Sequence, residues 1–88
     1  MNDLMKKHVP VITVVKQDPL TVEVHVGKLL KHPNEAEHYI GWIELYSEDK
    51  LLAKADLTPV STEPVITFVL NEKVQKLRAL EWCNVHGV

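Results

Sequence analysis

Hydrophobic and polar residues alternate along most of this chain. The segment LTVEVHV (20–26) shows the pattern most clearly, because leucine or valine occupies every second position. Such alternation places apolar side chains on one face of a β-strand and polar side chains on the other. The segment VPVITVV (9–15) is rich in β-branched residues, which also favour strands. Four further segments predict strands, the last of which also suits a helix: IGWIELY (40–46), KLLAKADL (50–57), PVITFVL (64–70) and LRALEWC (77–83).

Turn-forming residues separate these segments and favour one fold class. Glycine, proline and asparagine occur between the runs, for example at Asp18-Pro19, Gly27 and Pro64. No segment predicts a long amphipathic helix, and the only candidate, NEKVQKLRAL (71–80), is short. Short strands separated by turns roughly every 8–12 residues are typical of sandwiches. The pattern therefore predicts an all-β protein, an antiparallel β-sandwich of about seven strands.

Length and composition narrow the class of protein. Eighty-eight residues suit a single domain, 1–88, and a domain this small often needs a disulfide, a metal or a partner subunit. One cysteine rules out an internal disulfide. The net charge of −2 favours neither nucleic acid nor an anionic membrane as a partner. The start, MNDLMKKHVP, lacks the apolar stretch of a signal peptide. We therefore expect a soluble cytoplasmic protein.

One long loop and the two ends of the chain carry most of the candidate chemistry. The segment GKLLKHPNEAEHY (27–39) has no strand pattern, and loops of that length are usually functional or disordered. It contains His32 and His38. His8 stands at the entrance of the first predicted strand, and Cys83 and His86 lie close to the C-terminus. If the fold is a sandwich, these loops and strand ends can meet at one end of it.

Two interpretations of these residues remain open at this stage. Exposed histidines and a lone buried cysteine are ordinary features of a small domain. Gathered together, four imidazoles and a thiolate would bind zinc, copper or iron. Structural zinc usually takes four ligands and more than one cysteine, and blue copper takes an axial methionine, which does not follow His86. Five donors suit five-coordinate iron with one open position. The fifth histidine, His25, alternates with Thr21 and Glu23 and is interpreted as a surface residue.

Three strings in the chain resemble one known family. KHVPVI (7–12), KHPNEAEHYIGWIELY (31–46) and CNVHG (83–87) are similar to the iron domain of superoxide reductases, the neelaredoxin and desulfoferrodoxin family. The resemblance covers most of the chain. It implies an immunoglobulin-like β-sandwich and one iron ion (Fe²⁺/Fe³⁺) per chain. The ligands it implies are four histidines in a plane, His8, His32, His38 and His86, and Cys83 as the axial ligand opposite an open site.

The same resemblance implies an activity and its partners. The reaction is the one-electron reduction of superoxide to hydrogen peroxide, with rubredoxin as the electron donor and a dimer or tetramer as the assembly. Lys7 is the expected catalytic residue, because a flexible ammonium beside His8 can attract superoxide and donate a hydrogen bond. Lys6, Lys28 and Lys31 would enlarge the positive patch. The backbone N–H groups of Val85 and His86 are the expected donors to the sulfur of the cysteine ligand.

Two departures from the family pattern and three alternative functions accompany this interpretation. Desulfoferrodoxins have an additional N-terminal domain with a four-cysteine iron centre, for which this chain lacks the cysteines. Lys6 stands where family members commonly have a glutamate that can occupy the sixth position of the oxidised iron. The alternatives are a binding module without metal, a structural metal site, and an electron carrier whose metal has no open position.

Overall fold

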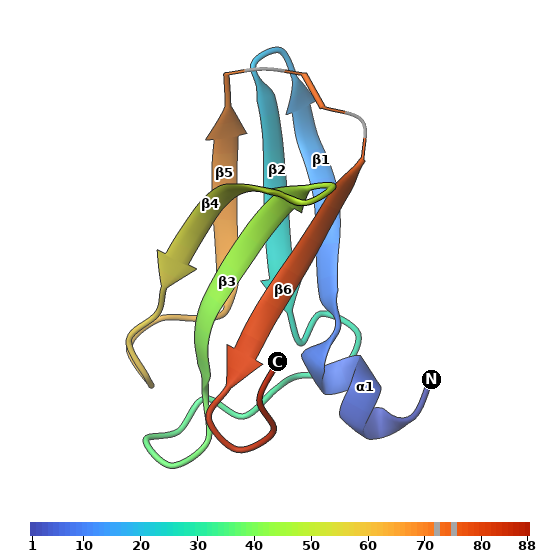
Figure 1. The fold of residues 1–88 in the computed structure, drawn as a ribbon. Helices are drawn as coiled ribbons and strands as arrows, with labels where there is room; N and C mark the ends of the chain where they lie inside the picture. The colour runs from blue at the N-terminus through green and yellow to red at the C-terminus, as the bar shows by residue number, and fades with distance from the viewer. Residues whose placement is uncertain (72, 75) are drawn as a thin grey trace.

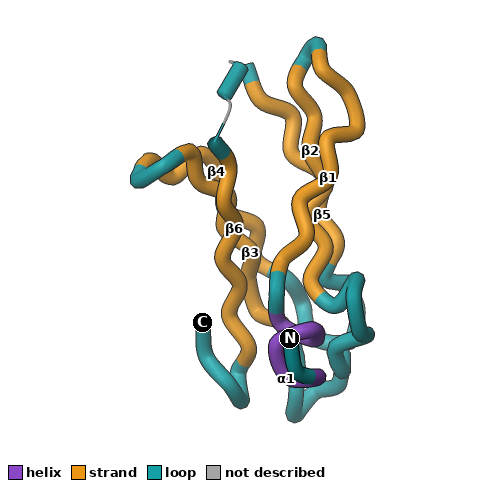
Figure 2. Tube along the Cα trace, turned by 90° about the vertical axis from the view of Figure 1, so that its right-hand side faces the viewer, coloured by secondary structure: helices purple, strands orange, loops and turns teal. Residues whose placement is uncertain are grey.

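Two three-stranded antiparallel sheets face each other in the computed structural model, which describes residues 1–71, 73–74 and 76–88 (Figure 1, Figure 2). The strand orders are β1-β2-β5 in one sheet and β4-β3-β6 in the other. A short helix, α1 (Asp3–His8), precedes the first strand. The strands are β1 (Pro10–Gln17), β2 (Leu20–Val26), β3 (Ile40–Ser47), β4 (Lys50–Asp56), β5 (Val65–Leu70) and β6 (Leu77–Cys83).

The core lies between the sheets, where the alternating segments place their apolar faces. In β2, Leu20 and the three valines that follow at every second position are all buried. Opposite them, Ile43 and Leu45 of β3 have no exposed surface. Phe68 and Leu70 of β5 and Cys83 of β6 belong to the same buried cluster. The cysteine is therefore part of the hydrophobic core even though it lies five residues from the end of the chain.

An irregularity in β3 adjusts the sheet beside the cysteine. Ile40 pairs with Cys83, the next pair is Trp42 with Trp82, and the register shifts between them. Gly41 occupies the shifted position, and a Cβ atom there would lie 2.5 Å from Cε3 of Trp82, because the indole packs directly over the glycine. Bulges of this kind bend a strand and redirect its side chains. Here the bulge lets Ile40 and Ile43, three positions apart, both face the core.

The six segments that alternation identified are the six strands of the structure. β2 and β6 have the predicted bounds, and the other four differ by one or two residues. The fold class is confirmed, but the described residues form six strands rather than about seven. In the segment NEKVQKLRAL (71–80), residues 77–80 are strand, while 72 and 75 lie outside the described residues. No helix among the described residues is long and apolar enough to cross a membrane.

The helix α1 was not predicted from the sequence, although His8, its last residue, does lie just before the first strand as expected. Asn2 caps the helix, since its Oδ1 accepts a hydrogen bond from the Met5 N–H at 2.8 Å. The helix ends at His8 because the ring of Pro10 sterically disfavours helical backbone angles at the residue before it, Val9. Six residues are too few to produce a recognisable helical period in the sequence.

One end of the sandwich gathers the segments that carry the candidate ligands. In Figure 2, α1, the connection between β2 and β3, and the chain after β6 all lie at the lower end of the two layers. The strands bring them there, because β2 ends, β3 begins and β6 ends at the same end of the molecule (Figure 1).

Candidate metal centre

Four imidazoles form a closed ring at this end of the sandwich. The ring-centroid distances are 4.6 Å for His8–His32, 4.8 Å for His32–His38, 5.3 Å for His38–His86 and 4.9 Å for His86–His8. Neighbouring rings are steeply inclined to one another, with interplanar angles from 60° to 83°. No ring is therefore stacked face to face on its neighbour.

The sulfur of Cys83 joins three of these imidazoles in a compact group of donor atoms. One possible ligand atom from each of His8, His32, His38 and Cys83 lies within 4.8 Å of every other. Cys83 has no exposed surface and His32 is 2% exposed, whereas His86 is exposed. His86 is not a member of this compact group, although its ring is a neighbour of both His8 and His38. The group therefore has a buried side, where the sulfur lies, and a side that faces water.

Hydrogen bonds fix the tautomers of two of the histidines. His8 Nδ1 lies 2.7 Å from the Leu4 carbonyl oxygen, and His32 Nδ1 lies 2.6 Å from the Pro33 carbonyl oxygen. A carbonyl oxygen only accepts, so each Nδ1 carries the hydrogen and each neutral ring keeps a lone pair on Nε2. Metal-binding histidines usually donate their other N–H to a carbonyl or carboxylate in this manner.

The two Nε2 atoms are close enough to require a positive charge between them. His8 Nε2 and His32 Nε2 are 3.1 Å apart, and two lone pairs at that distance repel unless a proton or a metal ion lies between them. Burial and the neighbouring imidazoles lower the pKa of His32 to about 4, while the hydrogen bond to Pro33 acts in the opposite direction. Because a proton is therefore disfavoured at neutral pH, a metal ion is the better occupant. Two nitrogen ligands that each lie about 2.1 Å from one metal ion, with an N–metal–N angle of about 90°, are about 3 Å apart.

Further observations fit a metal with nitrogen and sulfur ligands. Among the described residues, His38 Nε2 is buried and has no hydrogen-bond partner, and buried polar atoms without partners need an explanation. Imidazole and thiolate together suit iron, zinc or copper and do not suit magnesium or calcium. The donors present therefore fit the iron that the sequence resemblance implies, and they do not by themselves distinguish it from zinc.

Gly27 allows His32 to enter the group. Its φ is +87°, a conformation that favours glycine. A Cβ atom at this position would lie 2.8 Å from the backbone nitrogen of His32 and 3.3 Å from its Cβ. The chain can thus turn sharply at the end of β2 and bring the histidine back against the core.

The remaining residues named from the sequence lie around the ring. Lys7 is in the last turn of α1, and its charge contributes to lowering the pKa of His86, after burial and the neighbouring histidines His8 and His38. Val85 is exposed in the turn after β6, where the observed backbone bonds join Cys83 and Gly87 in both directions, at 3.0 and 2.8 Å. A hydrogen bond from Val85 to the sulfur stays a prediction. His25 lies in the middle of its sheet and is not part of the group, as expected.

Sequence reasoning missed Glu81. Its side chain is only 5% exposed, and Oε2 has no hydrogen-bond partner among the described residues. Burial raises the pKa of this carboxyl to about 7. A pocket of about 200 Å³ between α1 and the C-terminal turn is lined by Glu81 together with His8 and His86. The sequence signal for its burial was the alternation in β6, because residues 81 and 83 are two positions apart and therefore share the inward face of the strand.

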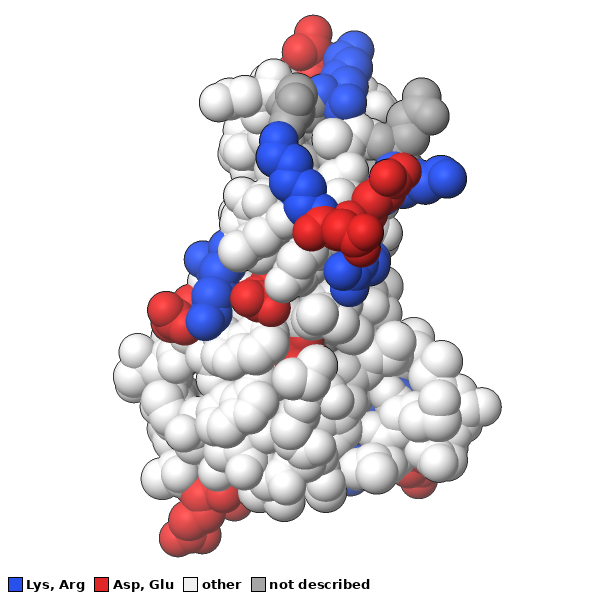
Figure 3. Space-filling view, in the orientation of Figure 1, with Lys and Arg blue, Asp and Glu red and all other residues white. Residues whose placement is uncertain are grey.

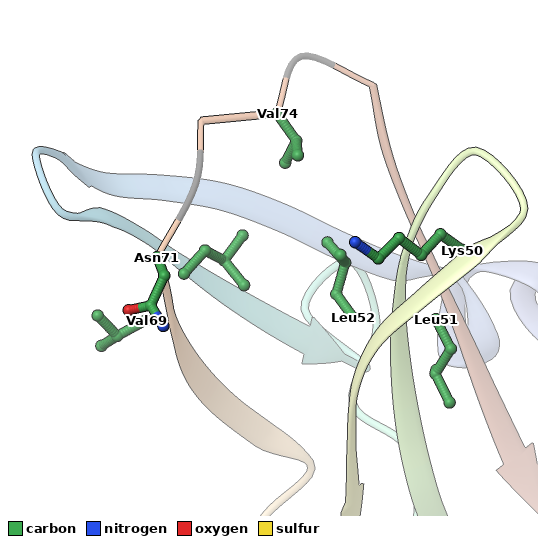
Figure 4. A pocket seen from close by; sticks show the side chains of 7 residues that line it. Lys50, Leu51, Leu52, Val69, Asn71 and Val74 are labelled. Atoms are coloured by element: carbon green, nitrogen blue, oxygen red, sulfur yellow. The ribbon is translucent and has the colours of Figure 1, made fainter.

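A second pocket lies at the opposite end of the sandwich and differs in chemistry. It has a volume of about 350 Å³, and Figure 4 shows Leu52 of β4 and Val74 of the β5–β6 connection on two sides of it. Its lining is mainly aliphatic and includes no histidine or cysteine. This pocket thus offers none of the imidazole or thiol groups that gather at the other end.

Known proteins resemble this chain over nearly its whole length. Residues 1–88 match the family described as Desulfoferrodoxin. The chain is 43% identical over 94 residues to a superoxide reductase from Pyrococcus horikoshii, a match that covers 94% of this chain and 82% of that protein. The reduced superoxide reductase (neelaredoxin) from Archaeoglobus fulgidus has a TM-score of 0.81 and 34% identity, over 98% of this chain and 88% of that one. The superoxide reductase from Nanoarchaeum equitans has a TM-score of 0.79 and 29% identity, over 93% of this chain and 86% of that one.

The buried carboxyl of Glu81 predicts a specific pH dependence for the metal-free protein. Folding raises the pKa of this carboxyl from 4.5 to about 7, so the folded state favours the protonated form. The stability that this protonated form contributes is complete below pH 4.5 and is lost as the pH rises through 7. Glu81→Gln, which is never charged, should therefore gain stability relative to the wild type as pH rises, by up to about 3 kcal/mol at pH 8. Urea denaturation at pH 5 and pH 8 measures this difference.

Glu23→Gln is the matched control, because Glu23 lies on the outward face of β2. Its effect on the free energy of unfolding should be similar at both pH values. An equal effect of Glu81→Gln at the two pH values would show that the buried carboxyl does not titrate in this range.

Proposed function

The chain belongs to the desulfoferrodoxin family, and from this membership we propose that it reduces superoxide at a single iron ion. The observation that carries the proposal is the closed ring of four imidazoles beside a buried thiol. The proposed ligands are His8, His32, His38, His86 and Cys83.

The chemistry of the reaction assigns different tasks to the metal and to the chain. Iron cycling between Fe²⁺ and Fe³⁺ supplies one electron, and superoxide accepts that electron and two protons to become hydrogen peroxide. The chain's residues hold the metal, expose one side of it and attract the anion. A reductant must return one electron per turnover, and rubredoxin is the donor that the family resemblance implies. The assembly proposed on the same basis is a dimer or tetramer.

The burial of Cys83 supports a direction of approach for the substrate. The thiol is part of the core, whereas His86, on the ring's edge, is exposed. A small anion from water would therefore approach the imidazole ring from the side opposite the sulfur. On the buried side, the anionic sulfur donates electron density, which favours transfer of an electron to the substrate. A thiolate shielded from water in this way is stabilised chiefly by the metal it binds.

Lys7 supports the attraction of superoxide to this side. It is next to His8 in α1, and its charge acts on His86. Lys28 is instead engaged on β1, where its Nζ donates to Thr13 Oγ1 at 3.3 Å. Figure 3 shows the outer face of the β4-β3-β6 sheet, where charged side chains gather over the upper half and are sparse over the lower half. Glu35 and Glu37 are exposed in the loop that carries His38, so Lys7 would attract an anion in the presence of nearby negative charge.

Metal analysis combined with product analysis tests the proposal. Purified protein should contain one iron per chain and, in its oxidised form, show a visible sulfur-to-iron charge-transfer band. With a reductant present, each superoxide consumed should yield one hydrogen peroxide and no dioxygen. A zinc-containing protein that leaves superoxide unchanged would contradict the proposal, and so would dioxygen formed in the ratio of a dismutation.

Replacing the thiol should abolish both the visible band and the activity. Cys83→Ser removes the only thiol of the chain, so the charge-transfer band should disappear and superoxide reduction should fall by more than about a hundredfold. His32→Ala should lose iron. His25→Ala is the matched control and should keep wild-type iron content and spectrum. Iron loss in His25→Ala equal to that in His32→Ala would show that the proposed ligand set is wrong.

Lys6 predicts an open position on the oxidised iron. Lysine only donates hydrogen bonds and is cationic at neutral pH, so it cannot replace the family's glutamate as a ligand. Glu35 and Glu37, the carboxylates nearest in sequence to His38, are exposed. Azide should therefore bind the oxidised protein readily, and Lys6→Glu should slow azide binding and shift the ferric spectrum. Stopped-flow absorbance measures both effects. Azide binding at the same rate in the two proteins would contradict an open position.

Lys7→Ala should slow the reaction with superoxide chiefly through lost attraction. We expect up to about a tenfold lower second-order rate constant at low ionic strength, and a smaller loss at high ionic strength, where exposed charges are screened. Pulse radiolysis over a range of salt concentrations measures the rate constant. Lys28→Ala is the control, since that lysine bonds to Thr13. A loss independent of salt would assign Lys7 a role other than attraction.

A further inference from the structure

The loop that carries His38 has little regular structure of its own. It spans residues 27–39, between β2 and β3, and its only internal ladder contact is the pair of backbone bonds between Glu35 and His38, at 2.9 and 3.1 Å. These bonds fix His38 relative to its own loop. They do not fix the loop relative to β6, where Cys83 lies.

Asn84 supplies that missing connection. Its Oδ1 accepts from the Tyr39 N–H at 2.9 Å, and its Nδ2 donates to the Glu37 carbonyl at 2.9 Å. Its backbone N–H donates to the Tyr39 carbonyl at 3.2 Å. The residues on both sides of His38 are thus bonded to one asparagine. The Tyr39 N–H can only donate, so the orientation of the Asn84 amide is determined by its partners.

The position of Asn84 in the chain links three of the proposed ligands. It follows Cys83 directly and precedes His86 by two residues, and the turn that contains it is closed by the Cys83–Gly87 backbone bonds. The His38–His86 contact, which this asparagine spans, is the longest side of the imidazole ring, at 5.3 Å, and the least perpendicular, at 60°. If the side-chain bonds to Glu37 and Tyr39 were lost, the backbone bond from the Asn84 N–H to the Tyr39 carbonyl and the pairing of Ile40 with Cys83 would hold only the C-terminal side of His38.

From this geometry we propose that Asn84 is a positioning residue that sets His38 against Cys83 and His86 before the metal binds. The inference rests on the proposed iron site. Asn84 does not touch the metal, and it acts through the backbone on either side of His38. Its side chain needs both a donor and an acceptor at fixed positions, which aspartate, serine and alanine each fail to provide. Such support keeps the donor atoms in place while the site is empty and slows their separation once it is filled.

Iron retention and the ferric spectrum test the role. Asn84→Ala removes both side-chain bonds and should accelerate iron transfer to an excess of chelator by about 10- to 100-fold, with a shifted or broadened sulfur-to-iron band. Asn84→Asp keeps the size and the acceptor for Tyr39 N–H but replaces the donor to the Glu37 carbonyl. It should give a smaller acceleration in the same direction. Circular dichroism checks that each variant retains the sandwich.

Asn34→Ala is the matched control, because Asn34 also makes three hydrogen bonds to backbone. Asn34 lies in the loop that carries His32 and His38, but its partners lie in the connection between β4 and β5, which carries no proposed ligand. These partners are Val60 N–H at 2.8 Å, Val60 C=O at 3.3 Å and Thr62 C=O at 3.3 Å. Its iron release should stay within about twofold of the wild type. Equal acceleration in Asn34→Ala and Asn84→Ala would overturn the inference in favour of general loosening of the loop. Wild-type iron release in Asn84→Ala would overturn this inference alone, whereas a wild-type protein that binds no iron would overturn it together with the proposed function.

Discussion

The close approach of imidazole lone pairs is the constraint on which the functional end of this protein depends. His8 Nε2 and His32 Nε2 lie 3.1 Å apart, and both rings have used their N–H groups on backbone carbonyls. A buried polar group without a partner costs free energy comparable to a lost hydrogen bond or more. A cation at the centre of the ring converts this repulsion into attraction for every imidazole at once. Binding of the metal should therefore be coupled strongly to folding at this end of the sandwich.

The strands and the segments outside them contribute different members of the proposed ligand set. The β4-β3-β6 sheet supplies the buried thiol of the proposed ligand set, Cys83, by continuing the inward-facing alternation of β6 to its last residue. The histidines come from segments outside the strands, and the loop that carries His38 is tied to the residue after β6 by the side-chain hydrogen bonds of Asn84. Rigid strands thus determine where the sulfur lies, while side-chain clamps determine where the loop that carries His38 lies.

The surroundings of the ring are asymmetric in charge. On one side Glu81 is buried between β6 and α1, where desolvation raises its pKa to about 7. On the side of α1 that bears Lys7, positive charge acts on His86. Glu81 lines a pocket together with His8 and His86, so a carboxyl and an ammonium both lie close to the imidazole ring.

Much of the architecture could be predicted from the sequence, because alternation is a local signal. The segments 20–26 and 77–83 became β2 and β6 without a change of bounds, and the motifs KHVPVI, KHPNEAEHYIGWIELY and CNVHG identified the family. The helix α1 escaped prediction because six residues hold less than two turns. The inward position of Glu81 follows from the alternation in β6, whereas the clamp formed by Asn84 depended on tertiary structure alone. Asn84 bonds residues 45 and 47 positions away, and contacts between such distant residues produce no periodic pattern along the chain. By itself the sequence determined the strands and the chemistry of the donors, whereas only the packing of the two sheets decided which donors meet, how deeply each is buried and what holds them there.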